Sequence, residues 1–378
     1  MKKILVIVMC SFLFSHYTFA QKNKRISSKG FAVLEKGGKF QDYKFTRHSL
    51  GENDVLIEIK YASICHSDVH QVNDDWRPGN FPMVPGHEMV GVVTKVGSKV
   101  TKFKIGDYAG VGTMVNSSDT TQAYKEENGG VWNPMKTVWT YNANDPFHNN
   151  EPTQGGYANN IVVNENFSIK VPQNADLQKI APLFCAGITV YSPIQFSKVS
   201  KGQKVAVAGF GGLGDMAVKF LQAIGADITV IDVNDEKRAL AEKMGLKYLD
   251  GKNAQEVQAH NNQFDFVLST VPTSYDPYLY LDLLKVRGEM AVVGQPAVTD
   301  KAAVQMLSLP FHANKLMYGS VIGTLEMEQR MVDWCVENNV YPDVKIIPAN
   351  AESITEVYHL LRNHEGVFRY VIDMTTLK

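Results

Sequence analysis

The sequence predicts two domains of different class: an all-β barrel or sandwich first, then an α/β domain with a parallel, doubly wound sheet. From Phe31 to about Val171, short β-branched runs are separated by turn residues, which is typical of β domains. From about Leu177, strand-like runs alternate with stretches of helical spacing, which favours a parallel sheet. The chain of 378 residues is 44% hydrophobic and 20% charged, enough apolar mass for two cores.

In the β half, Asp54 to Lys60 alternates apolar and polar residues, and Val90 to Val96 is a second strand-like run closed by Gly97. Residues 113–154 are polar and turn-rich without sustained periodicity, so we expect a long loop or lobe there.

In the α/β half, apolar residues recur at helical spacing between the buried runs. The expected strands are Lys204 to Ala208, Asp227 to Ile231, Phe264 to Ser269 and Met290 to Val293, and the expected helices are Gly214 to Ile224 and Asp235 to Met244. The tail adds a helix over Met327 to Glu337 and a strand over Phe368 to Asp373.

A glycine-rich turn joins the first of these strands to its helix: Gly209-Phe210-Gly211-Gly212-Leu213-Gly214. Glycine permits the tight turn and the close approach of a pyrophosphate, which the helix N-terminus attracts. Asp232 follows 18 residues after the last glycine, where a carboxylate can accept hydrogen bonds from a ribose diol and repel a 2′-phosphate. NAD is therefore favoured, and NADP stays possible because Lys237 and Arg238 could hold a phosphate. Alternatively, Asp232 merely caps the next helix.

Two cysteines and a histidine, Cys65, His87 and Cys185, are of the types that form a catalytic zinc site with an open fourth position. Taken singly, each could be an ordinary buried residue. Their occurrence together with a dinucleotide fingerprint favours the metal.

The chain resembles the zinc-dependent medium-chain alcohol dehydrogenases over residues 30–375. The resemblance rests on Gly86-His87-Glu88-Met89-Val90-Gly91, Cys65-His66-Ser67-Asp68-Val69-His70, Leu183 to Pro193 and the glycine-rich turn. The last three are similar to the cinnamyl alcohol dehydrogenases and broad-range aldehyde reductases. The resemblance implies a GroES-like β-barrel catalytic domain and a Rossmann cofactor domain. The implied segments are a catalytic domain over 21–178, a cofactor domain over 179–323 and a C-terminal return over 324–378.

The resemblance also implies a role for each motif residue. Cys65, His87 and Cys185 would hold the zinc, with Glu88 as a second-shell or transient ligand and Asp68 orienting His87. Zinc would polarise the aldehyde or favour the alkoxide, while a hydride passes to or from the nicotinamide. The remaining implied roles are proton transfer through Ser67 and His70, pyrophosphate contact through His66 and Arg369, and support of the nicotinamide by Thr189.

One departure from the family concerns its second, structural zinc, which relatives hold with four cysteines in the lobe. This chain has Ser118, Thr121, Tyr124 and Trp132 at those places, so we expect one catalytic zinc and no structural one. Asp232 is a further departure, because the cinnamyl branch tends to carry Ser or Thr there and to use NADPH.

Residues 1–20 have a positive start, an apolar run and small residues before Gln21, the pattern of a cleaved signal peptide. We therefore expect a periplasmic or secreted protein without a membrane span after cleavage, or a cytoplasmic one if the segment is not used. With 38 basic against 39 acidic residues, nucleic acid is not an expected partner.

The sequence thus favours an alcohol dehydrogenase or aldehyde reductase acting on a small, aromatic or allylic substrate, and the family implies a homodimer. Two alternatives stay open: a zinc-free quinone or enoyl reductase, and an exported zinc- or ligand-binding protein on a dehydrogenase scaffold.

Overall fold

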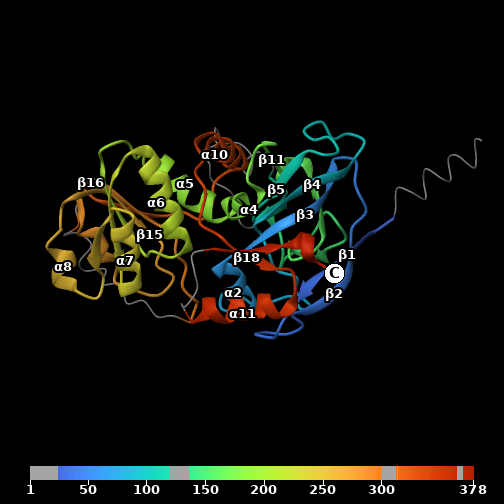
Figure 1. Cartoon of the computed structure of the whole chain (residues 1–378), viewed down its shortest axis with the longest axis horizontal. Helices are drawn as coiled ribbons and strands as arrows, with labels where there is room; N and C mark the ends of the chain where they lie inside the picture. Colours follow the sequence, from blue (N-terminus) through green and yellow to red (C-terminus); the bar gives the residue numbers. More distant parts are fainter. Residues whose placement is uncertain (1–23, 120–135, 300–311, 313, 364–368) are drawn as a thin grey trace, which may run out of the picture.

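The computed structural model describes residues 24–119, 136–299, 312, 314–363 and 369–378. A β-rich catalytic domain and an α/β cofactor domain lie at opposite ends of the long axis (Figure 1). The expected signal peptide over 1–20 lies outside the described residues. Among the described residues, no helix is long and apolar enough to cross a membrane.

The catalytic domain is built on a seven-stranded sheet in the order β11-β5-β4-β3-β19-β18, with β10 also paired to β3. Its strands are β3 (Asp54–Ile64), β4 (Met89–Val96), β5 (Tyr108–Val111), β10 (Asn160–Asn164), β11 (Ile169–Val171), β18 (Lys345–Pro348) and β19 (Tyr370–Asp373). A separate hairpin pairs β1 (Ile26–Ala32) with β2 (Gln41–Arg47). The helices of this domain are α2 (His66–Val72), α4 (Leu177–Ile180), α10 (Leu325–Asn338) and α11 (Ala351–Arg362).

The central strand β3 pairs with three other strands of the catalytic domain. Its N-terminal half pairs with β10, its C-terminal half pairs with β19, and β4 runs along its other edge. Most of its residues are buried, because the sheet is covered on both faces at this point. The chain therefore returns to its first domain at its C-terminal end, with Tyr370 opposite Ile64.

The cofactor domain has a six-stranded, all-parallel sheet in the order β14-β13-β12-β15-β16-β17. Its strands are β12 (Lys204–Ala208), β13 (Asp227–Asp232), β14 (Lys247–Asp250), β15 (Phe264–Ser269), β16 (Leu284–Val292) and β17 (Leu316–Gly319). Its helices are α5 (Ala186–Phe196), α6 (Gly212–Ile224), α7 (Asp235–Lys243), α8 (Ala254–Gln258) and α9 (Pro277–Leu281). The order of strands reverses between β12 and β15, and open α/β sheets bind ligands at such a switch point.

Helix α6 lies where the spacing of apolar residues predicts a helix. Met216, Ala217, Phe220 and Leu221 are fully buried on one face, and the helix ends at Gly225, whose φ of +84° is left-handed. Glycine adopts that conformation at the lowest cost, so the end of the helix is encoded locally.

The segment 113–154 contains more regular structure than the sequence indicated. A ribbon pairs β6 (Met114–Ser117) with β7 (Thr137–Trp139), and a second pairs β8 (Asn144–Asp145) with β9 (Glu151–Pro152). Strands of two to four residues are too short to display alternation, which is why no periodicity was visible. Of the four lobe positions that lack cysteine, Thr121, Tyr124 and Trp132 lie outside the described residues, and Ser118 follows β6.

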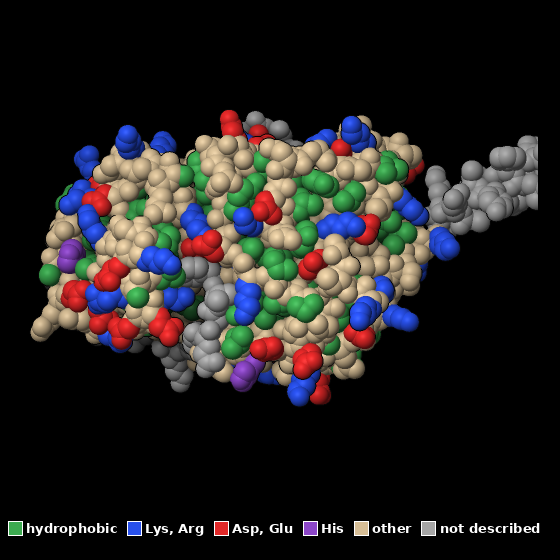
Figure 2. Space-filling view, viewed as in Figure 1, with side chains coloured by type: hydrophobic (Ala, Val, Ile, Leu, Met, Phe, Trp, Pro, Cys, Tyr) green, Lys and Arg blue, Asp and Glu red, His purple; other side chains and the backbone are tan. Residues whose placement is uncertain are grey.

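Charges of both signs are interspersed on the face of the molecule shown in Figure 2. No broad basic stripe crosses the described residues of this face, which agrees with the near-zero net charge of the sequence.

Candidate active site

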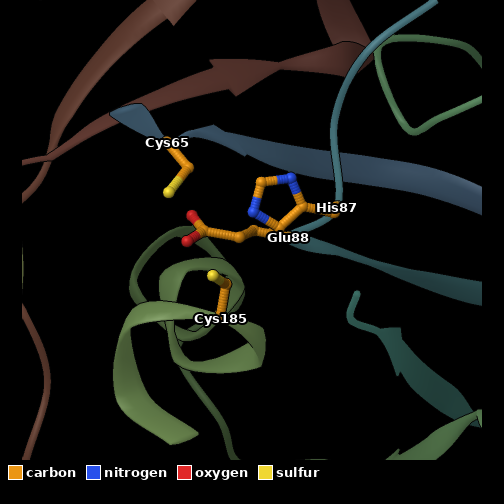
Figure 3. Close-up of side chains that lie close together, drawn as sticks. All are labelled: Cys65, His87, Glu88 and Cys185. Carbon is orange, nitrogen blue, oxygen red and sulfur yellow. The ribbon is translucent and has the colours of Figure 1, made fainter. Parts of the chain in front are cut away.

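Four potential metal ligands converge where the two domains meet: Cys65, His87, Glu88 and Cys185. Their ligand atoms all lie within 4.8 Å of one another, and all four residues are buried (Figure 3). Cys65 stands between β3 and α2, and Cys185 immediately precedes α5, so each cysteine is the N-cap residue of a helix. The predicted ligand set is therefore brought together from three distant parts of the chain.

Asp68 holds two of these residues in place. Its Oδ1 accepts hydrogen bonds from Nδ1 of His87 at 2.9 Å and from the backbone N–H of Gly86 at 3.2 Å. Its Oδ2 accepts from the backbone N–H of Cys65 and from the Tyr157 hydroxyl, both at 2.9 Å. With Nδ1 donating to a carboxylate, His87 presents Nε2 to the cluster, the arrangement found in most histidine metal sites.

Glu88 is fully buried and is paired with Arg369, which also donates to the hydroxyl of Ser63. The Oε1 atom of Glu88 accepts from the backbone N–H of Ala186 at 3.3 Å. Nε of Arg369 is buried and has no hydrogen-bond partner among the described residues. A buried guanidinium N–H without an acceptor is costly, so this atom suits a negatively charged ligand group such as a phosphate.

The electrostatics of the cluster favour a bound cation. A hydrogen bond from Cys185, together with His87 and Arg369, holds the pKa of Cys65 well below its usual range, whereas the same pairing and burial raise the pKa of Cys185. Burial raises the pKa of Glu88 to about 7, against the opposing effect of Arg369. A divalent cation bound between the two sulfurs would favour the ionised form of both thiols.

The donor types fit zinc. Two thiolates and one imidazole are soft to borderline ligands, which zinc prefers and which magnesium and calcium do not. Three firm protein ligands leave room for a fourth group, as in catalytic rather than structural zinc sites.

The glycine-rich turn follows β12 and opens α6 at the switch point of the sheet. Gly209 has a φ of +89°, and a Cβ on Gly214 would lie 2.0 Å from the carbonyl oxygen of Gly209. A Cβ on Gly211, by contrast, would meet nothing within 4 Å among the described residues. The turn therefore needs glycine at its two ends for its own geometry and leaves open space at Gly211, beside the half-buried Gly212 and Leu213.

Asp232 ends β13 and accepts three backbone hydrogen bonds. Its Oδ2 accepts from the N–H of Phe210 at 2.5 Å, and its Oδ1 accepts from the N–H groups of Val233 at 2.8 Å and Asn234 at 3.0 Å. The interpretation of Asp232 as the cap of the following helix is wrong, because Asn234 caps α7 through its own side chain. Asp232 instead ties the glycine-rich turn to the neighbouring strand.

Comparison with known proteins agrees with this geometry. Residues 51–173 match the alcohol dehydrogenase GroES-like domain, and residues 212–337 match the zinc-binding dehydrogenase domain. The chain is 37% identical over 347 residues to a probable formaldehyde dehydrogenase, AdhA, of Bacillus subtilis, covering 92% of this chain and 97% of that protein. The chain belongs to the zinc-dependent medium-chain alcohol dehydrogenase family.

Other relatives place this dehydrogenase near the cinnamyl alcohol dehydrogenase branch. It is 39% identical over 338 residues to the NADP-dependent alcohol dehydrogenase C 1 of Mycolicibacterium smegmatis, covering 88% of this chain and 94% of that one. The structure of the Helicobacter pylori cinnamyl alcohol dehydrogenase in complex with NADP(H) is 46% identical, with a TM-score of 0.87 and coverage of 93% and 99%. The GroES-like and Rossmann architecture predicted from the sequence is confirmed by these matches.

Helix α2 carries the residues predicted to move a proton in this dehydrogenase. The Oγ of Ser67 lies 3.5 Å from the Sγ of Cys65, which places the hydroxyl at the metal cluster. One helical turn later, Nδ1 of His70 lies 2.8 Å from a carboxylate oxygen of Asp75. Nε2 of His70 is buried and has no partner among the described residues, so this nitrogen is the one left to exchange a proton.

The structure also locates the other predicted residues of the dehydrogenase. Thr189 is buried on α5, one turn beyond Cys185, and its N–H donates to the Cys185 carbonyl at 2.9 Å. His66 begins α2 with its ring 4.9 Å from that of His70.

Sequence reasoning missed two supports of the site. Tyr157 hydrogen-bonds to Asp68, and Asp75 hydrogen-bonds to His70. Asp75 lies five residues after His70, just beyond α2, and could have been found by asking which acid could orient the relay histidine. Tyr157 lies 89 residues from Asp68, and no local pattern links the two.

Proposed function

We propose that this dehydrogenase interconverts a primary alcohol and its aldehyde, with a preference for aromatic or allylic substrates, and that Cys65, His87 and Cys185 hold its zinc. The convergence of these three buried ligands beside Ser67 is the observation that carries the proposal. The names of the relatives, which include formaldehyde, cinnamyl alcohol and NADP-dependent alcohol dehydrogenases, support the reaction class. A zinc-free quinone or enoyl reductase would have no use for this ligand set.

When bound, zinc supplies a Lewis acid that polarises a carbonyl oxygen, and the nicotinamide supplies or accepts the hydride. The residues of the chain orient the substrate and move the proton. Ser67 donates a hydrogen bond to the substrate oxygen, and His70 passes the proton between this hydroxyl and solvent. Ser67 and His70 lie three residues apart on one face of α2, and Asp75 fixes the orientation of the His70 ring.

A bulky planar substrate is supported by Trp76. Its indole stacks on His70 with ring centroids 4.8 Å apart and an interplanar angle of 25°. Its Nε1–H donates to the carbonyl oxygen of Pro296 at 3.1 Å, so the indole links α2 to the cofactor domain. An indole that is fixed by His70 and by Pro296 favours flat aromatic or allylic aldehydes, because these can stack on an aromatic ring.

The cofactor we assign is NAD(H), with NADP(H) as the weaker alternative. Asp232 is a carboxylate at the end of β13, where its charge would oppose a 2′-phosphate. Arg238 stacks over Tyr248 at 4.5 Å, which engages the guanidinium face in a cation–π contact. Arg369 and His66 would contact the pyrophosphate, and Arg369 has the buried Nε–H described above.

An initial-rate assay with the purified full chain tests the reaction. Cinnamaldehyde is reduced with NADH and with NADPH, before and after treatment with a zinc chelator. We expect turnover that chelation abolishes and zinc restores, and a higher kcat/KM with NADH. Zinc binding without turnover for any aldehyde would instead support a binding protein on this scaffold, and chelator-insensitive turnover would overturn the zinc assignment.

The variant Asp232→Ser tests the cofactor assignment separately. Loss of charged hydrogen bonds to a ribose should lower kcat/KM for NADH by about 10- to 100-fold relative to NADPH. Serine keeps a hydroxyl that can accept from the neighbouring backbone N–H groups, which protects the turn. An unchanged ratio of kcat/KM for NADH to kcat/KM for NADPH would show that Asp232 only holds the glycine-rich turn in place.

Two further assignments concern metal content and assembly. We assign no thiolate-bound structural zinc, since Ser118 replaces the first lobe cysteine, so a Cys65→Ser, Cys185→Ser double variant should hold no thiolate-bound metal. The edge of the parallel sheet is the second feature, and it concerns assembly. A homodimer through the sheet edge at β17 is supported by the exposure of Leu316 (47%) and Met317 (39%) on that edge strand. Light scattering of the purified chain measures its molar mass in solution and so tests the homodimer.

A further inference from the structure

A second cluster of metal-ligand side chains lies in the catalytic domain, apart from the active site. His48 directly follows β2, Asp54 begins β3, and His148 lies in the turn between β8 and β9. One ring nitrogen of each histidine and a carboxylate oxygen of Asp54 all lie within 4.8 Å of one another. The two imidazoles stack with centroids 3.6 Å apart and an interplanar angle of 12°.

The ring of His148 is oriented by a carboxylate, as the ring of His87 is. Its Nδ1 lies 2.7 Å from a carboxylate oxygen of Asp145, just as Nδ1 of His87 lies 2.9 Å from Asp68. This hydrogen bond fixes the tautomer and leaves the lone pair on Nε2, the arrangement that orients histidine toward a metal ion. The chain therefore carries two carboxylate-supported histidines, each beside further ligands.

The remaining members of the cluster are also held in position. The Asp54 carboxylate accepts the N–H of Gly51 at 2.8 Å and lies 3.8 Å from Nδ1 of His48. Nδ1 of His48 lies 3.0 Å from the carbonyl oxygen of Ser49. Asp54 is nearly buried, whereas the histidine side chains are 21% and 28% exposed, so an ion could enter from solvent.

The local charge balance suits a dication. Asp54 and Asp145 bring two negative charges to the cluster. Two cationic side chains of this region are engaged elsewhere: Arg25 is paired with Glu151 at 2.7 Å, and Arg47 donates to the carbonyl oxygens of residues 154 and 155. The cluster also borders a shallow, open hollow, whose walls include His48, Asp145 and His148 but none of the four active-site ligands.

We propose that His48, His148 and Asp54 form a second metal site, which binds one divalent transition ion such as Zn²⁺ or Ni²⁺. Imidazole and carboxylate together suit these ions, whereas Mg²⁺ and Ca²⁺ prefer all-oxygen sites. Ligands of a tetrahedral zinc lie about 3.4 Å apart, given metal–nitrogen distances of about 2.0–2.1 Å. The lone pair of an imidazole nitrogen lies in the ring plane, so at least one of the two stacked rings must turn out of the stack before both can bind one ion. Both side chains are partly exposed, which leaves room for this rotation.

The position of this site indicates that its ion braces the active-site loop. It would join the end of β2, the start of β3 and the β8–β9 turn. The chain leads from that turn into residues 154–157, whose backbone pairs with Val84, Pro85 and Gly86 just before His87. A bound ion would thus lower the freedom of the segment that carries the catalytic histidine.

Calorimetric titration of the full chain, already loaded with one zinc at the thiolate site, tests the proposal. We expect Ni²⁺ to bind in one further equivalent and to raise Tm, since a ligand bound only by the folded state stabilises it. His148→Gln and His48→Gln should each weaken this second equivalent by at least about tenfold, the range seen when supports of a metal site are lost. His359→Gln, on the exposed face of α11, is the matched control and should bind like the wild type.

The two metal sites are distinguished by a cysteine variant and by cobalt. The Cys65→Ser, Cys185→Ser double variant should lose thiolate-to-cobalt absorption and activity while the second equivalent remains. His148→Gln should keep the absorption and the activity and lose the second equivalent. Absence of a second equivalent in the wild-type chain would overturn the proposal, as would equal binding by the wild type and both histidine variants. Neither result would affect the assignment of the catalytic zinc.

Discussion

Replacing Asp68 with asparagine should release the catalytic zinc, because this carboxylate accepts four hydrogen bonds at once. The donors are His87, Gly86, Cys65 and Tyr157. An asparagine has one carbonyl oxygen, so its amide hydrogens must face one pair of these donors. The Tyr157 hydroxyl can rotate to accept, but a backbone N–H cannot. At least one hydrogen bond to a charged group is therefore lost, at about 1.5–3 kcal/mol.

The same substitution removes the negative charge that orients His87 and raises its pKa. Burial alone would lower that pKa, and Asp68 and Cys65 together raise it well above its usual range. Loss of such an outer carboxylate lowers zinc affinity by about 10- to 100-fold. We therefore expect Asp68→Asn to lose zinc to a competing chromophoric chelator at about one-tenth to one-hundredth of the wild-type chelator concentration.

Tyr157→Phe provides the graded comparison, because it removes one neutral donor and leaves the carboxylate charged. Its zinc affinity should fall less than that of Asp68→Asn, because only one of the four hydrogen bonds to the carboxylate is lost and the charge that orients His87 remains. The reasoning is refuted if Asp68→Asn binds zinc as tightly as the wild type, or if the two variants lose affinity equally. Thermal unfolding of both zinc-free variants separates loss of metal from loss of fold.

Three further outcomes are expected. In Gly110→Ala the new Cβ would lie 1.8 Å from the ring of Phe184, so overpacking should lower stability by about 1–3 kcal/mol, measured by denaturant unfolding. Burial raises the pKa of Glu328 to about 8 from 4.5, so the folded chain retains a proton that the unfolded chain releases. Stability should therefore fall as pH rises through this window and level off above it, whereas Glu328→Gln should lack this decline in Tm. Asp75→Ala should lower kcat by about tenfold or more with zinc content unchanged, because the His70 ring loses its support; an unchanged kcat would show that Asp75 does not position a relay histidine.

The sequence was informative wherever function is carried by a residue type at a fixed local spacing. The glycine-rich turn, the alternation of strands and helices, and the candidate ligands Cys65, His87 and Cys185, which the structure brings together, could be predicted because each depends on residue types with a chemical requirement of their own. The sequence left open the alternative role of Asp232 as the cap of α7, since Asp232 and Asn234 are both good helix caps and only the backbone decides between them.

Contacts between distant segments could not be predicted in this way. His48 and His148 are separated by 100 residues and lie in turns without periodic pattern, so nothing local pairs them. The predicted contact between Arg369 and the cofactor gave no indication that the guanidinium also neutralises Glu88. The pairing of Arg369 with Glu88 depends on the register of β19 against β3, which tertiary packing determines.

The return of the chain to its first sheet has a consequence for synthesis. The hydroxyl of Ser63 donates to the carbonyl oxygen of Tyr370, 307 residues later in the chain. Strand β3 therefore cannot pair with β19 until almost the whole chain has left the ribosome. The parallel sheet between them is made of local crossovers and can form earlier. A prematurely terminated chain would hold both cysteines and His87 but would lack Arg369, and Glu88 would then face a sheet edge without its counter-charge. Only a completed polypeptide can therefore assemble a charge-balanced metal centre.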